Sequence, residues 1–86
     1  MAERFTEKQG QYLAYIYNYT VINGRPPAEA DLQNFFRTTP PSIHQMIRKL
    51  EGKRLISRVP GQARSIRLLI DPDRIPRLLN RAWHIM

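Results

Sequence analysis

Residues 40–51 combine an apolar stripe with a polar side that carries no acidic group before Glu51. Ile43, Ile47 and Leu50 follow the i, i+4, i+7 spacing of one buried helix face. Because an ideal helix turns by about 100° per residue, its other sides present Pro41, Ser42, His44, Gln45, Arg48 and Lys49. Amide, hydroxyl and cationic side chains can pair with base edges in the major groove of DNA, and proline can contact a thymine methyl group.

The start of this predicted helix also favours an anionic ligand. Thr39 is a good N-cap, and Pro40 suits the first helical position, where its missing N–H costs nothing. The free N–H groups and the positive end of the helix dipole attract phosphate. Thr38 and Thr39 add hydroxyl groups at the same place.

A second group of basic residues surrounds a predicted turn at Pro60-Gly61. Arg58, Arg64 and Arg67 bracket the loop 60–64, which also contains Gln62. A basic hairpin tip can lie along phosphates or place an arginine in the minor groove. The alternative is an ordinary hairpin whose charged edges discourage aggregation.

Charge is concentrated in this part of the chain. The net charge is +7, and residues 48–67 hold seven of the fourteen lysines and arginines with one carboxylate, Glu51. Residues 1–47 contain four basic and four acidic residues, so the whole excess lies from Arg48 onward. A local excess beside a helix is typical of a surface that binds a polyanion.

Composition excludes several other classes. The 86 residues form a single small domain without cysteine, so disulfides and thiolate metal sites are excluded. We find no catalytic dyad or triad, metal cluster, phosphate-binding glycine loop, signal peptide or membrane-spanning run. We therefore expect a cytoplasmic, nucleoid-associated protein that is not an enzyme, with no metal, cofactor, small-molecule ligand or membrane partner.

The elements that would position these groups can be located from caps and periodicity. Thr6-x-x-Gln9 matches a capping box for a first helix that ends near Gly24. Apolar spacing then predicts a helix over 28–36, the helix over 40–51, strands over 53–59 and 65–70, and a final helix from about Arg74. The fold class is mainly α with a small β-hairpin. Residues 1–70 form the DNA-binding domain, and residues 71–86 form a C-terminal helix that either mediates dimerisation or closes the core.

The first helix carries four tyrosines whose role is open on sequence grounds. Leu13, Ile16, Tyr17 and Thr20 recur at helical spacing and are expected to face the core. Tyr12 and Tyr19 share another face, with Tyr15 near them. They either pack at the edge of the core or form a surface for a partner, because tyrosine is enriched at interfaces.

The order helix, helix, turn, helix, hairpin resembles a winged helix-turn-helix, and more narrowly the DNA-binding domain of the LexA repressor family. The resemblance spans residues 5–70. It rests on Thr6-x-x-Gln9 with Ile16, Gly24-Arg25-Pro26-Pro27, Ala30-Asp31-Leu32, Leu50 with Leu55-Ile56, and Gly61-x-x-Arg64-Ser65-Ile66-Arg67-Leu68-Leu69.

The resemblance implies a recognition helix in the major groove and a wing, the hairpin, on the backbone. The positions that match the family's base-contacting surface are Thr39, Pro41, Ser42, His44 and Gln45. The family usually carries acidic or asparagine side chains there, so a different operator is expected. The turn before the helix is about one residue shorter. The family's self-cleaving peptidase domain uses a Ser-Lys pair, and no lysine follows Lys53, so its cleavage switch is not expected here.

The sequence therefore predicts a sequence-specific double-stranded DNA-binding protein that regulates transcription. A homodimer on a pseudo-palindrome would double the contacts of a single half-site. The alternative is a docking or dimerisation module that uses the same scaffold and the tyrosines of the first helix.

Overall fold

Helix α1 (Glu7–Asn23) begins and ends where its caps predict. In the computed structural model, which describes residues 5–79, Thr6 Oγ1 accepts from the Gln9 N–H at 3.1 Å. Gln9 Oε1 accepts from the Thr6 N–H at 3.0 Å, which completes the capping box. Gly24 ends the helix with φ +74°, a left-handed conformation that glycine adopts without strain. Both predicted helix ends are confirmed.

Helices α2 (Glu29–Phe36) and α3 (Pro40–Gly52) follow in contact with one another. The Asp31 carboxylate accepts from the Ala28 N–H at 2.8 Å and so caps α2. Arg37 turns the chain in a left-handed conformation with φ +52°, and Thr39 caps α3 just before Pro40. The helix that sequence placed at 40–51 is confirmed, with one further residue at its end.

The hairpin consists of β1 (Ile56–Ser57) and β2 (Arg67–Leu68), which pair antiparallel with Ile56 opposite Leu68. The predicted hairpin is confirmed, but its strands are much shorter than 53–59 and 65–70. The Ser65 hydroxyl explains the early end of the ladder, because it accepts from the Val59 N–H at 2.9 Å in place of a backbone carbonyl. It also donates toward the Gln62 carbonyl at 2.9 Å, which closes the loop.

The core lies where α1, α2, α3 and the base of the hairpin meet. The predicted stripe of α3, Ile43, Ile47 and Leu50, is wholly buried. The remaining large buried side chains are Tyr12, Leu13, Ile16, Leu32, Phe36, Leu55, Ile56, Ile66 and Ile70. Tyr12 stacks on Phe36 with ring centroids 3.9 Å apart and an angle of 4° between the rings.

The tyrosines of α1 lie partly as sequence allowed, with Tyr12 and Tyr15 packed at the core, but Tyr17 lies on a different side from the one it was assigned. Tyr12 is 2% exposed and belongs to the core, so it is not available to a partner. Tyr15 is half-buried against Phe35 and Phe36. Tyr17, which was expected to face the core, is 37% exposed. The buried face of α1 is centred on other residues than helical spacing suggested, because α1 packs against both α2 and the hairpin.

The final helix from about Arg74 is not found over residues 74–79. Pro72–Arg74 form one 3₁₀ turn, η1, and residues 75–79 are not helical. The buried Gln11 amide explains this, because its Nε2 donates to the Arg77 carbonyl at 2.9 Å and its Oε1 accepts from the Leu79 N–H at 2.7 Å. The rest of that prediction, including Ala82 and Trp83, lies outside the described residues, and its role in dimerisation stays a prediction.

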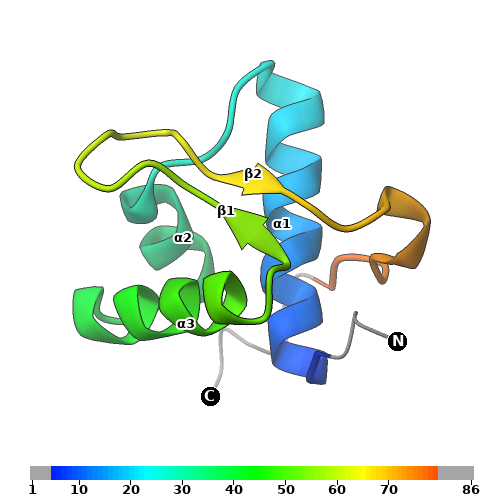
Figure 1. The fold of residues 1–86 in the computed structure, drawn as a ribbon, viewed down its shortest axis with the longest axis horizontal. Helices are drawn as coiled ribbons and strands as arrows, with labels where there is room; N and C mark the ends of the chain where they lie inside the picture. The colour runs from blue at the N-terminus through cyan, green and yellow to red at the C-terminus, as the bar shows by residue number, and fades with distance from the viewer. Residues whose placement is uncertain (1–4, 80–86) are drawn as a thin grey trace.

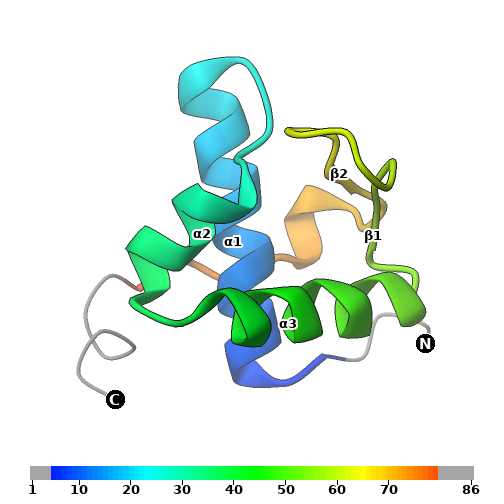
Figure 2. The same cartoon turned by 90° about the vertical axis from the view of Figure 1, so that its left-hand side faces the viewer.

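Three helices and an antiparallel hairpin in this order form a winged helix-turn-helix. In Figure 1, α1 stands upright, α2 and α3 lie to one side of it, and the hairpin crosses in front. Figure 2 shows α3 along one end of the molecule, away from the last turns of α1. Within residues 5–79, no helix is long and apolar enough to cross a membrane.

Candidate nucleic-acid interface

The polar side of α3 is free of internal contacts along most of its length. All six residues predicted there are exposed, namely Pro41, Ser42, His44, Gln45, Arg48 and Lys49. The side chains of Arg48 and Lys49 make no hydrogen bond or ion pair with the other residues of 5–79. Glu51, the first carboxylate of the helix, is bound by Arg58. This side therefore offers an unneutralised pair of cations beside an amide and an imidazole.

The start of α3 holds its two hydroxyl groups in one fixed arrangement. Thr39 Oγ1 accepts from the Ser42 N–H at 3.4 Å and donates to Ser42 Oγ at 3.1 Å. The Ser42 hydroxyl proton is consequently left to donate outward. Thr38 is half-buried, and its N–H donates to the Gln33 carbonyl at 3.2 Å. The helix start can thus present N–H and O–H donors to a phosphate.

Of the predicted hairpin cations, Arg58 is engaged inside the protein. Its Nε lies 3.2 Å from Glu51 Oε1, and its side chain is 18% exposed. The pair links β1 to the end of α3. Arg67 is exposed on β2 and Gln62 is exposed in the loop. Arg67 and Gln62 are therefore the hairpin side chains placed to meet a ligand.

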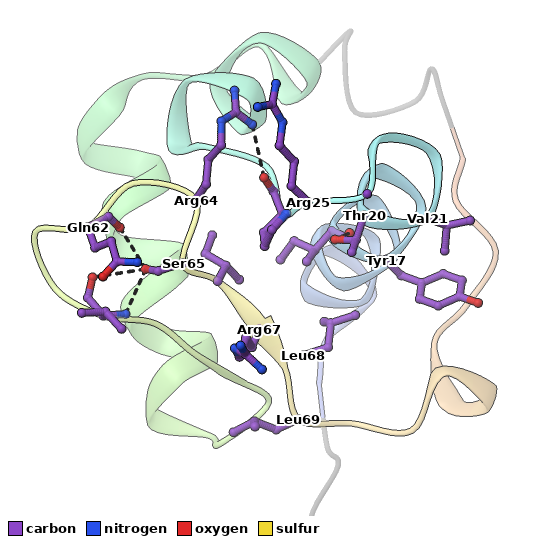
Figure 3. Close-up of a pocket in the computed structure, with 15 residues that line it drawn as sticks. Tyr17, Thr20, Val21, Arg25, Gln62, Arg64, Ser65, Arg67, Leu68 and Leu69 are labelled. Carbon is purple, nitrogen blue, oxygen red and sulfur yellow. Dashed lines mark hydrogen bonds between the residues drawn. The ribbon is translucent and has the colours of Figure 1, made fainter.

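Arg64 also turns back into the protein. Its Nη1 lies 2.9 Å from the Tyr19 hydroxyl, 3.2 Å from the Pro26 carbonyl and 3.2 Å from Asp31 Oδ2. Its guanidinium carbon is 5.8 Å from the centre of the Tyr19 ring. The hydrogen bond with Tyr19 raises the pKa of Arg64 above its usual value, with Asp31 adding to the effect. Figure 3 shows the side chain pointing away from the loop tip toward the linker between α1 and α2.

We name these contacts of Arg64 with Tyr19, Pro26 and Asp31 the Arg64 clamp. Arg64 has φ +55°, a conformation that costs a residue with a side chain some energy. The clamp joins segments 33 to 45 residues apart in the chain. It therefore fixes the loop of the hairpin against α1 and α2.

Sequence reasoning missed one cation beside the helix start. Arg37, in the turn between α2 and α3, is exposed and next to Thr38. The sequence signal that could have identified Arg37 is its position immediately before Thr38 and Thr39. Lys53, by contrast, is held by Gln9, whose Oε1 lies 2.8 Å from its Nζ. The charge excess of 48–67 is thus divided between groups that hold the fold and groups that face outward.

No cluster of three or more histidine, aspartate or glutamate side chains that could hold a metal occurs within the described residues. The site consists of hydrogen-bond donors, cations and one helix end. Groups of this kind can bind an anionic, hydrogen-bonding surface.

Comparison with known proteins gives the same picture. The LexA repressor of Thermosipho melanesiensis is 39% identical over 67 residues, which are 78% of this chain and 34% of that protein. The chain is a LexA-like domain. The LexA repressor of Thermosipho africanus is 33% identical over 73 residues, covering 85% of this chain and 37% of that protein. That of Bartonella quintana is 32% identical over 81 residues, covering 93% of this chain and 34% of that protein.

The LexA-like chain thus spans about a third of the length of the curated relatives it matches. No protein-family model matches it.

Proposed function

We propose that this LexA-like chain binds double-stranded DNA sequence-specifically and regulates transcription. The observation that carries the proposal is the exposed polar side of α3, which has no carboxylate before Glu51, itself paired with Arg58. Three matched relatives named as repressors support a regulatory role. In this proposal α3 enters the major groove, and the hairpin lies on the backbone.

The residues divide by the groups they can reach. Gln45 and Arg48 read base edges, because amide and guanidinium groups pair with adenine and guanine acceptors. Ser42, His44 and Pro41 border the same surface. Lys49, Arg67, Gln62 and the Thr38-Thr39 start of α3 contact phosphates. Arg58 and Arg64 act differently from the expectation based on sequence, since each holds the hairpin in place through a carboxylate partner.

The proposal is tested by fluorescence anisotropy of the protein with duplex DNA over a salt series. We expect log K to fall linearly with log salt, with a slope of about 0.9 per neutralised phosphate. Arg48→Ala should weaken binding to a selected site by about 1–3 kcal/mol and relax its base preference. Arg74→Ala is the matched control, because it removes an arginine from η1, which lies on the other side of α1 from α3 in Figure 1.

The result that would reject DNA binding is the absence of a complex at about 50 mM salt, where phosphate contacts are strong. Equal losses from Arg48→Ala and Arg74→Ala would reject the role of α3. Dimerisation on a pseudo-palindrome is a separate part of the proposal. Sedimentation of the protein with a two-half-site duplex tests it, and a strictly 1:1 complex would contradict it.

A further inference from the structure

A groove separates the last turns of α1 from the outer side of the hairpin. It has a volume of about 650 Å³, and residues from α1, the α1–α2 linker and the segment 65–69 line it. Figure 3 shows Tyr17 and Val21 projecting outward from α1, and Leu68 and Leu69 on the hairpin segment beside that helix. We call this space the α1–hairpin groove. Two side chains of the LexA-like site described above, Gln62 and Arg67, also line this groove, whereas the residues of α3 do not.

The groove gathers most of the exposed apolar surface of the described residues. Among the described residues, six large apolar side chains are well exposed. Four of them line this groove: Tyr17 at 37%, Val21 at 64%, Val59 at 51% and Leu69 at 57%. Single exposed apolar residues are ordinary on protein surfaces, but contiguous ones mark interaction sites. The floor adds the buried Ile16 and Ile66.

The charge at this groove has one sign. Arg25 and Arg67 are exposed at its rim, and no aspartate or glutamate is among its lining residues. The third arginine there, Arg64, is neutralised by Asp31. An apolar floor with a cationic rim is complementary to a ligand that carries both apolar side chains and carboxylates.

The groove also lies apart from the polar side of α3. Strand β1 contacts α3, whereas β2 contacts α1, so the hairpin stands between the groove and α3. Figure 2 shows the end of α1 and the loop of the hairpin at the top, away from α3, while β1 runs down to the end of α3. A ligand in the groove therefore leaves the polar side of α3 open.

From these observations we propose that the α1–hairpin groove docks an acidic peptide segment of a partner protein. Apolar side chains of the segment pack on Tyr17, Val21 and Leu69. Its carboxylates pair with Arg25 and Arg67 at the rim. The interface is small, which is typical of a transient regulatory contact.

The probe for this proposal is a short fluorescein-labelled peptide that alternates glutamate with leucine, added to the protein without DNA. We expect saturable binding that is on the order of tenfold tighter than that of the same peptide with lysine in place of glutamate. Val21→Ser and Arg25→Ala should each weaken it. Ile22→Ser is the matched control, since Ile22 is 78% exposed but does not line the groove.

Four results would overturn the proposal. The first is the absence of saturable binding up to about 1 mM peptide, because a dissociation constant weaker than this would be too weak to matter. The second is equal binding of the lysine peptide, or equal weakening by Ile22→Ser. The third is a loss of DNA affinity in Val21→Ser, which would make the groove part of the DNA interface. The fourth is a change in self-association in Val21→Ser by sedimentation, which would make the occupant a second copy. Because the peptide is measured without DNA, a failure of DNA binding leaves this test intact.

Discussion

Replacing Arg64 should change the affinity for DNA without changing its salt dependence. Arg64 lies in the basic loop, so sequence alone predicts a phosphate contact and a lower salt slope after Arg64→Ala. In the structure its guanidinium is occupied by Tyr19, Pro26 and Asp31. A cation that is already paired releases no counterion from DNA. Arg64→Ala should therefore loosen the hairpin and weaken binding while the slope stays the same.

The size of the difference follows from the cations that remain free. Arg37, Lys49 and Arg67 are exposed, their side chains are unpaired among residues 5–79, and none of them is assigned to a base edge. With about 0.9 per phosphate, these three give a slope near 2.7, so a fourfold rise in salt lowers affinity about 40-fold. Arg67→Ala should reduce that loss to about 12-fold. Arg64→Ala should leave it at about 40-fold.

The assay is fluorescence anisotropy with one duplex between about 50 and 200 mM salt. Tyr19→Phe is the companion variant, because it removes the hydroxyl partner of Arg64 and no charge. Thermal unfolding of each variant shows that the fold is retained. A slope that falls in Arg64→Ala as it does in Arg67→Ala, but not in Tyr19→Phe, would refute the internal role of Arg64.

Four further predictions concern the fold and are read by urea unfolding or hydrogen exchange. Tyr12→Ala should lower the free energy of unfolding by about 3–5 kcal/mol, because it removes a buried stacked ring. Burial raises the pKa of Tyr12, so the folded state holds the hydroxyl proton more tightly than the unfolded state does. The free energy of unfolding should therefore fall as pH rises through the usual tyrosine range. Tyr12→Phe should make that fall shallower. Gly52→Ala should raise the free energy of unfolding by about 0.5–1 kcal/mol, since the added Cβ meets open space. Gly10→Ala should lower it, since the added Cβ would meet two side chains at 3.0 Å. Equal gains in stability from the two variants would contradict this. Gln11→Ala should cost about 1–3 kcal/mol by leaving two backbone groups without partners, and should speed exchange of the Leu79 amide first; unchanged exchange there would show that this side chain does not hold the segment.

The features that sequence predicted well are those decided within a few residues. The capping box of Thr6 and Gln9, the left-handed end at Gly24 and the Thr39-Pro40 start each depend on neighbours three or four positions away. The buried stripe of α3 was also predicted, because this helix packs on one side only. Its exposed side then follows from helix geometry.

The features that sequence missed depend on distant parts of the chain. The apolar spacing of residues 75–79 suggested a helix, but Gln11, more than 60 positions away, holds that segment by its backbone. Tyr17 was assigned to the core from its helical spacing, which does not give the centre of the buried face. That assignment is wrong because α1 packs on two neighbours, α2 and the hairpin. The partners of Arg64 could not be read from local sequence for the same reason.

The two arginine–carboxylate pairs of the hairpin also affect how fast a ligand can be engaged. A hairpin with so short a ladder is not stable in water by itself, and here Arg58 and Arg64 tether it to three helices. Its conformational entropy is therefore lost when the chain folds and not when a ligand arrives. Association then needs no loop ordering at the moment of encounter, and the spacing between α3 and the hairpin is set before contact. A ligand whose two contact points do not match that spacing is rejected by geometry alone.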